Sequence, residues 1–307
     1  MAQTAPSEST FGELELTNPV QFKAIADAIR AKTGKTGTIV ANDFAGKIEN
    51  LPQGVDKPSW VQSTLPANKN WHSVCYGDGK FVAVASSSNI AAYSTDGINW
   101  TQTTLPISAG WSSVCYGNGK FVAVAKGGST GAYSTDGIIW ASMTMPGSLN
   151  LYSVCYGGGK FVAICVGALL TAYSTDGINW SSGRLPVSTN WNSVCYGNGK
   201  FVAVGYGNAA YSTDGINWTQ VTLPVRVYYA SVCYGNGKFV VVDPGDIGES
   251  DAVSHSIYST DGINWTLATM PKTQEWSSVC YGNGKFIAVA SGLNVSAYLK
   301  DYFDEWA

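Results

Sequence analysis

The chain has 307 residues, and 45% of them are apolar, which is enough to build a packed core and excludes a protein that is disordered throughout. Charged residues make up 13%, about half the usual share. With a net charge of −3 and three arginines, the sequence offers little to a phosphate backbone, so nucleic acid is excluded as a partner. The longest apolar run, which begins at Phe161, is too short to span a bilayer, so membrane insertion is not expected.

Residues 1–54 contain no repeat and no tryptophan, and they predict a small helical domain. Apolar residues follow a near-helical spacing after Asn18-Pro19, and Gly34 ends the pattern. A second short helix is expected to begin at Asn42, with the asparagine as its cap. A linker at 52–58 leads into the second domain, residues 55–307.

The second domain is built from one unit repeated six times. The motif SVCYG recurs at intervals of 40, 40, 40, 38 and 47 residues. Each copy predicts four short strands: Asn-Gly or a similar pair turns the first into the second, and Asp-Gly turns the third into the fourth. Apolar runs such as FVAVA indicate burial on both faces. Short antiparallel strands that are buried on both sides are typical of a propeller blade. The copies begin at Ser73, Ser113, Ser153, Ser193, Ser231 and Ser278.

The two ends of the repeat array predict a closed ring. The sixth copy lacks a regular fourth strand, and an orphan copy of that strand, SWVQSTLP, stands at 59–66 before the first repeat. Pairing of 59–66 with the strand around 295–299 would leave no exposed edge. The predicted fold is therefore all-β: a six-bladed β-propeller closed by an N-terminal strand and preceded by a small α-helical N-terminal domain. A right-handed β-solenoid is the alternative.

The turn motif YSTDGINW, first seen at Tyr93–Trp100, resembles the Asp-box of sialidase-like propellers. Here Asp and Gly are adjacent and the Trp comes one residue earlier, so the motif is a variant. The resemblance implies a structural role, away from any catalytic pocket. We expect the aspartate to accept hydrogen bonds from the turn and the tryptophan to pack between blades.

Variation among the copies is concentrated in two connections, from the second to the third strand and from the fourth to the first. Both are expected on one rim, as on a recognition surface carried by a rigid scaffold. Aromatic residues with hydroxyl and amide neighbours begin the innermost strands beside this rim, a composition that suits sugars. Packing of the tryptophans between blades is the alternative. The acidic loop Asp243–His255 could recruit a cation or a basic partner, or simply be solvated. The predicted ligand-binding residues are Trp71, His72, Trp111, Tyr152, Trp191, Asn192, Tyr229 and Trp276.

Two stretches, IADAIRAKTGKTGTI at 25–39 and the following FAGKIENL, resemble the leader domain of tail-associated proteins of phages and prophages, and the STDGINW repeats resemble repeats of the same class. The resemblance implies a component of a virion tail or fibre that binds a host-surface glycan or cell-wall polymer through the variable rim. Residues 1–54 would join it to other tail proteins, with assembly into a homo-oligomer. The expected location is the virion.

Two other functions remain open at this point. A docking hub within a baseplate or capsid fits the same repeats. A sialidase-like glycosidase would need three arginines from different blades, whereas the propeller carries only Arg184 and Arg226. We therefore predict no enzymatic activity, no catalytic residues, no metal and no cofactor.

Overall fold

The computed structural model describes residues 63–243, 255–270, 275–282, 284–291 and 296–299. The predicted helical domain at 1–54 lies outside these residues, so the predicted helices and domain boundary stay predictions. All of the described residues belong to one compact unit, Gln62–Ala307. They form strands and no helix, and none of them belongs to a helix that could cross a membrane.

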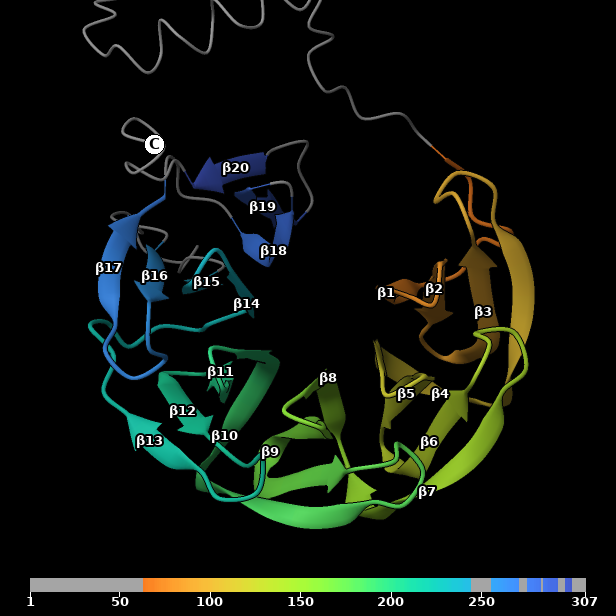
Figure 1. The fold of residues 1–307 in the computed structure, drawn as a ribbon, viewed down its shortest axis with the longest axis horizontal. Coiled ribbons are helices and arrows are strands. Elements are labelled where there is room, and N and C mark those ends of the chain that lie inside the picture. Colours follow the sequence, from red (N-terminus) through yellow and green to blue (C-terminus); the bar gives the residue numbers. More distant parts are fainter. Residues whose placement is uncertain (1–62, 244–254, 271–274, 283, 292–295, 300–307) are drawn as a thin grey trace, which may run out of the picture. The chain divides into compact units, whose positions relative to one another are not determined.

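The first four repeats are antiparallel sheets joined in pairs through two long strands: β4 joins repeats one and two, and β10 joins repeats three and four (Figure 1). Each long strand is the fourth strand of one repeat and the first of the next. Repeat one comprises β1 (Trp71–Gly77), β2 (Lys80–Ala85), β3 (Ser88–Ser94) and the first half of β4 (Thr101–Gly117). Repeat two adds the second half of β4, β5 (Lys120–Lys126), β6 (Gly128–Ser134) and β7 (Ala141–Leu149). Repeat three comprises β8 (Leu151–Gly157), β9 (Lys160–Ser174) and the first half of β10 (Ser181–Gly197).

In the last three repeats the described strands after β10 are short, with no more than seven residues. Repeat four comprises the second half of β10, β11 (Lys200–Gly205), β12 (Asn208–Ser212) and β13 (Thr219–Val221). Repeat five comprises β14 (Ser231–Gly235), β15 (Lys238–Val242), β16 (His255–Ser259) and β17 (Thr266–Thr269). Repeat six comprises β18 (Trp276–Gly282), β19 (Lys285–Ala290) and β20 (Ser296–Leu299).

The tight turns follow from the residues that the sequence places there. Between β4 and β5, Asn118 and Gly119 both have positive φ, 45° and 71°. This backbone matches the right-handed twist of the flanking strands and is favoured by Asn-Gly. The second strands that these turns begin are buried on both faces, as predicted: Phe121 and Val122 have no exposed surface.

Neighbouring repeats pack through their first strands, which line the inside of the arc in Figure 1. Between repeats one and two, Val114 packs in the same cluster as Cys75. Ser73 Oγ accepts a hydrogen bond from the Val114 backbone N–H at 3.1 Å, and the Tyr116 ring lies over Gly77. The same serine-to-valine bond recurs at each later junction, with the acceptors Ser113, Ser153, Ser193 and Ser231. The repetition of the motif therefore encodes a repeated interface.

The two variable connections of a repeat pair with each other, which places them on the same rim. Ser88 in the second-to-third connection of repeat one pairs with Ala109 in its fourth-to-first connection. Gly128 pairs with Leu149 in repeat two. The sequence predicted loops here, but the chain continues as strand through much of this rim in β4, β9 and β10, because the paired connections extend the ladder. The rim is thus a set of β-ribbons.

The predicted closing strand is described only in part. Its residues 63–66 are described, and Thr64 forms a parallel bridge with Asn99 in repeat one. Among the described residues β20 pairs with β19 alone, so the predicted pairing of 59–66 with β20 is not observed.

Candidate functional site

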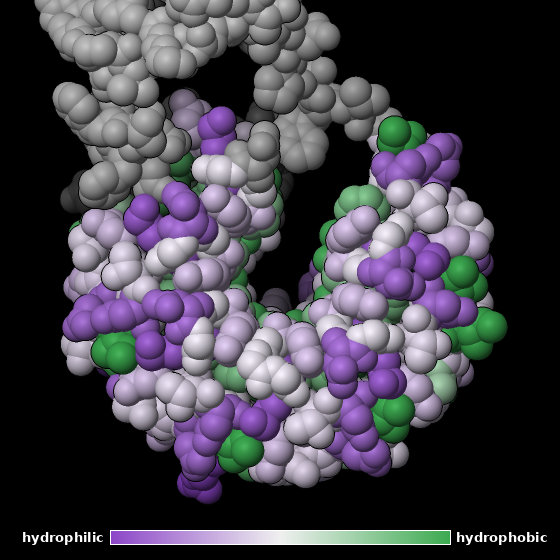
Figure 2. All heavy atoms as spheres, viewed as in Figure 1, coloured by the Kyte–Doolittle hydropathy of each residue, from purple (hydrophilic) through white to green (hydrophobic). Residues whose placement is uncertain are grey.

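A polar pocket of about 770 Å³ lies where the first strands of all six repeats begin. Figure 2 shows the described surface hollowed toward the centre of the arc. We call this the axial pocket. It has few ionisable groups, and hydroxyls dominate its lining. Serines contribute from repeats two to six: Ser112, Ser113, Ser153, Ser193, Ser231, Ser277, Ser278 and Ser291. The other lining residues are His72, Tyr152, Asn192, Tyr228, Ala230 and Glu275.

Four of these serines lie at the interfaces between repeats and can each donate a hydrogen bond into the axial pocket; we call them the donor row. Ser113, Ser153, Ser193 and Ser231 each accept the backbone N–H of a valine in the next repeat, at 3.1–3.3 Å. A hydroxyl has one proton as well as its lone pairs. Within the described residues none of these four protons is given to a protein acceptor. Each hydroxyl therefore keeps a proton that it can donate to a bound molecule.

His72 and Tyr152, both predicted ligand-binding residues, meet at one side of the axial pocket. Their ring centroids are 6.2 Å apart and nearly perpendicular. The ammonium group of Lys126 lies over the Tyr152 ring, 4.1 Å from its centroid. Partial burial lowers the pKa of His72, and the positive charge of Lys126 lowers it further. The imidazole is therefore held neutral near pH 7.

Asn192, also predicted to bind a ligand, instead holds a neighbouring tyrosine in place. Its Nδ2 donates to the Tyr229 carbonyl oxygen at 2.9 Å, and its Oδ1 accepts from the Tyr228 hydroxyl at 3.1 Å. Tyr228 lines the pocket and is 40% exposed, and its ring lies 6.4 Å from that of Tyr206. Sequence reasoning missed Tyr206 and Tyr228 because they lie in the variable connections. Their aromatic character on that rim was the available signal.

Four of the predicted aromatic ligand residues belong to the core. The side chains of Trp111, Trp191, Tyr229 and Trp276 have no exposed surface, so their faces are closed to a sugar in this arrangement. The rings lie between neighbouring repeats, which is the packing alternative that the sequence left open.

The first aromatic residue of the repeat also anchors the chain that precedes it. Trp111 Nε1 donates to the Ile107 carbonyl oxygen at 3.3 Å, four residues earlier. Half-buried Trp71 makes the same bond to the carbonyl oxygen of Ala67 at 3.0 Å. These indoles therefore fix the fourth-to-first connection, and Trp71 belongs to this structural group.

The ends of the acidic loop are part of the scaffold. Asp243 is buried, and its Oδ2 accepts the backbone N–H of His255 at 3.0 Å and contacts His255 Nδ1 at 3.2 Å. Residues 244–254 lie outside the described part of the chain, so the predicted cation or basic partner stays a prediction. In the part that is described, no three His, Cys, Asp or Glu side chains gather as a metal site.

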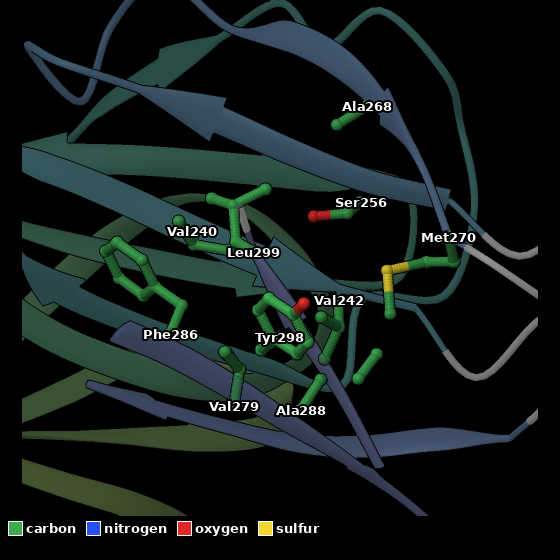
Figure 3. A pocket seen from close by; sticks show the side chains of 11 residues that line it. Val240, Val242, Ser256, Ala268, Met270, Val279, Phe286, Ala288, Tyr298 and Leu299 are labelled. Carbon is green, nitrogen blue, oxygen red and sulfur yellow. The ribbon is translucent and has the colours of Figure 1, made fainter. Parts of the chain in front are cut away.

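A second cavity, of about 60 Å³, lies between repeats five and six (Figure 3). Val240 and Val242 line it from β15, Phe286 from β19, and Tyr298 and Leu299 from β20. Its walls are apolar and it is about the size of a packing gap, so we assign it to the interface between these repeats.

No protein-family profile and no curated protein matches the sequence. Among solved structures, virginiamycin B lyase from Staphylococcus aureus matches with a TM-score of 0.64 and 14% identity, covering 77% of this chain and 86% of the lyase. A catalytically inactive variant of that lyase, solved with quinupristin, matches with the same TM-score and identity, covering 77% of this chain and 87% of the variant. A streptogramin B lyase matches with a TM-score of 0.54 and 10% identity, covering 72% of this chain and 91% of that lyase. These similarities establish a fold of the β-propeller type.

The comparisons correct the function predicted from the sequence. The proteins named above share the fold and are lyases, whereas the sequence predicted a receptor-binding virion component, with a docking hub or a sialidase-like glycosidase as alternatives. Those functions are not carried further, and the prediction of a non-enzyme finds no support. The resemblance to phage tail proteins, the virion location and the partners of residues 1–54 stay predictions.

Proposed function

We propose that the repeats form a binding protein for a small molecule rich in hydrogen-bond acceptors, which occupies the axial pocket. The donor row of Ser113, Ser153, Ser193 and Ser231 carries this proposal, because donors placed in a concave site select acceptors. Tyr152 and Tyr228 add aromatic surface beside the donors. That a lyase of the same fold was solved with quinupristin supports a small molecule as the class of ligand.

A titration followed by NMR tests this function. The chain has two histidines, so the imidazole resonances of His72 in the pocket and His255 beside Asp243 are readily separated. We expect the neutral probe N-acetylglycinamide to shift the His72 resonance in a saturable way and to leave His255 unchanged. Tyr228→Ala should weaken binding about threefold to tenfold, the usual worth of an aromatic contact.

The matched control is Ile139→Ala, which removes a side chain that is 77% exposed in the turn between the third and fourth strands. This change should leave the affinity as it is. Equal shifts at both histidines, or equal affinity in Tyr228→Ala, would argue against the axial pocket as the site.

A second candidate function is proton-transfer catalysis, which one observation favours. His72 lies in the pocket with its pKa lowered by burial and by Lys126, and a neutral imidazole is a suitable general base. Lyases share the fold. Incubation with quinupristin, followed by mass spectrometry and chromatography, tests this candidate. Product formed by the wild-type chain and lost in His72→Asn would support it, and no product would count against it.

We further propose that the six repeats close into a six-bladed ring. At each of the five described junctions a tyrosine of one repeat covers a glycine of the repeat before it, as Tyr116 covers Gly77. At the first and last repeats this tyrosine and this glycine have no partner from another repeat among the described residues. Tyr76 is 60% exposed, and no described atom lies within 4 Å of the position that a Cβ would take on Gly282. Tyr76 would cover Gly282 in the closed ring.

The described end of the predicted closing strand supports the same ring. Arg184, in the fourth strand of repeat three, bridges Asn217 in the turn of repeat four. Thr64 bridges Asn99 of repeat one in the same parallel manner. Thr64 therefore lies against repeat one as Arg184, in the fourth strand of repeat three, lies against repeat four. In a closed ring the repeat that precedes repeat one is repeat six, so Thr64 would belong to the fourth strand of repeat six.

A further inference from the structure

Beside one corner of the axial pocket, next to the lining residue Tyr152, lies a cation that the corresponding positions of the other repeats lack. Lys126 ends β5 and pairs across the rim with Gly110. Its side chain is half-buried and its ammonium group lies over the Tyr152 ring at 4.1 Å. The corresponding residues of the other five repeats are uncharged: Ser86, Val166, Tyr206, Pro244 and Ser291.

Within the described residues, the ammonium group of Lys126 has no carboxylate partner. Its neighbour is the aromatic face of Tyr152, which attracts a cation without neutralising it. Because Lys126 is partly buried, its charged ammonium group is only partly solvated, and this lowers the pKa of Lys126. His72, the other ionisable group at this corner, experiences the lysine as a repelling charge. An anion placed here would relieve both effects.

We propose that the ligand of the axial pocket carries a carboxylate group, and that Lys126 binds this group beside Tyr152 and His72. The inference rests on the proposed function and adds the chemical class of the ligand. The serine row favours it further, since hydroxyl donors and an ammonium group together suit a carboxylate. Glu275, the carboxylate among the described lining residues, belongs to repeat six, whereas Lys126 and Tyr152 belong to repeats two and three.

Two probes that differ in one group test this inference: N-acetylglycine, which ends in a carboxylate, and N-acetylglycinamide, which ends in a neutral amide. The readouts are the affinity and the pKa of His72, both from NMR titration of the imidazole resonance. We expect N-acetylglycine to bind at least about tenfold more tightly than the amide, in line with a charge-assisted hydrogen bond. Its carboxylate should also raise the pKa of His72 toward the ordinary value, whereas the amide should leave it low.

Lys126→Met should remove the preference for the acid and raise the pKa of His72 in the unbound protein. Lys126→Arg should keep the preference. The matched control is Lys120→Met, which removes a cation from the opposite end of the same strand, β5. It should change neither readout.

The outcomes separate the two proposals. If both probes bind the axial pocket with equal affinity, or if Lys126→Met binds the acid as tightly as the wild type, the carboxylate inference is overturned and the binding function stands. If neither probe moves the His72 resonance, both are overturned. If Lys126→Met loses the preference for N-acetylglycine over N-acetylglycinamide and Lys120→Met keeps it, the inference is supported.

Discussion

At the scale of single residues, the aspartate of the repeated turn acts as a local cap. Asp214 Oδ1 accepts the backbone N–H groups of Ile216 and Asn217, both at 2.8 Å, and Oδ2 accepts the Asn217 side chain. The Ser212 hydroxyl accepts the Gly215 N–H at 2.8 Å and donates to Asp214 Oδ1. The same bonds hold at Asp96, Asp176 and Asp261. The prediction that this aspartate accepts hydrogen bonds from the turn is confirmed.

This cap predicts a specific dependence on pH. Burial by itself raises the pKa of Asp214, but the bonds from Asn217, Ile216 and Ser212 outweigh it, so the pKa lies well below its ordinary value. A carboxyl group with a lowered pKa stabilises the fold above the ordinary pKa of the unfolded chain, and that contribution is lost as the pH falls through the folded value. Acid should therefore begin to weaken these turns near pH 4, and the loss should grow as the pH falls toward the folded pKa.

Asp214→Ala should reduce the free energy of unfolding by about 0.5–2 kcal/mol at pH 7, the usual worth of such a cap. Asp214→Asn, which keeps one acceptor oxygen, should lose less. The difference between wild type and Asp214→Ala should shrink below about pH 4, as the carboxyl group of the unfolded wild-type chain takes up its proton. Urea unfolding at several pH values measures all three proteins. A difference that stays constant down to pH 2 would contradict the role of the charge.

At the scale of the element, the first strand of each repeat forms the contact with the next repeat; we call this contact the joint. The serine of the strand accepts a hydrogen bond from a valine of the next repeat, and its glycine is covered by a tyrosine of the next repeat. Between repeats three and four, Ser153 accepts the Val194 N–H at 3.2 Å, and the Tyr196 ring lies directly over Gly157. A Cβ on Gly157 would collide with that ring. Glycine is therefore required here for close approach.

Gly157→Ala should lower the free energy of unfolding by about 1–3 kcal/mol or more, the usual cost of overpacking. Chemical unfolding measures it. Tyr196→Ala should also be destabilising by itself, but Gly157→Ala should cost little in its background, because the ring that the methyl group meets is gone. Additive effects in this double-mutant cycle would show that the two residues do not meet as described.

At the scale of the whole molecule, the first and last repeats carry matching halves of the same joint. Gly282 occupies in repeat six the place that Gly157 occupies in repeat three. Among the described residues nothing covers Gly282, and Tyr76 and Val74 are exposed at the other end, by 60% and 59%. Cys280 is likewise exposed, whereas its counterparts pack against a valine of the next repeat. Two complementary faces are therefore present in one chain.

If the ring closes, Gly282→Ala should destabilise the protein by about as much as Gly157→Ala, and the effect should disappear in a Tyr76→Ala background. In an open arc, Gly282→Ala would be neutral because no atom meets the added methyl group. Thermal unfolding of the four proteins measures this. Closure between copies rather than within one chain would make the stability depend on protein concentration, and a dilution series checks that.

The sequence by itself determined the six-fold repetition, the tight turns, the strands buried on both faces and the capping aspartates. Each of these depends on residues close together in the chain: Asn118 and Gly119 set a turn, and the Asp-box residues satisfy their own backbone. Whether Trp111 and Trp191 stack on a ligand or pack between repeats was left open by the sequence, because periodicity locates a residue along a strand, while its burial depends on the neighbouring repeat.

Only the tertiary structure decided the site. His72, Lys126 and Tyr152 come from three different repeats. They meet because the first strands that carry His72 and Tyr152 converge on the axial pocket and Lys126, at the end of β5, lies over the Tyr152 ring. Tyr228 lines the same pocket, and its hydroxyl donates a hydrogen bond to Asn192 across 36 residues of sequence. Contacts of this range follow from the packing of one sheet against the next, which no short motif specifies. That is why the repeats predicted a scaffold reliably, whereas the chemistry of its pocket became visible only in three dimensions.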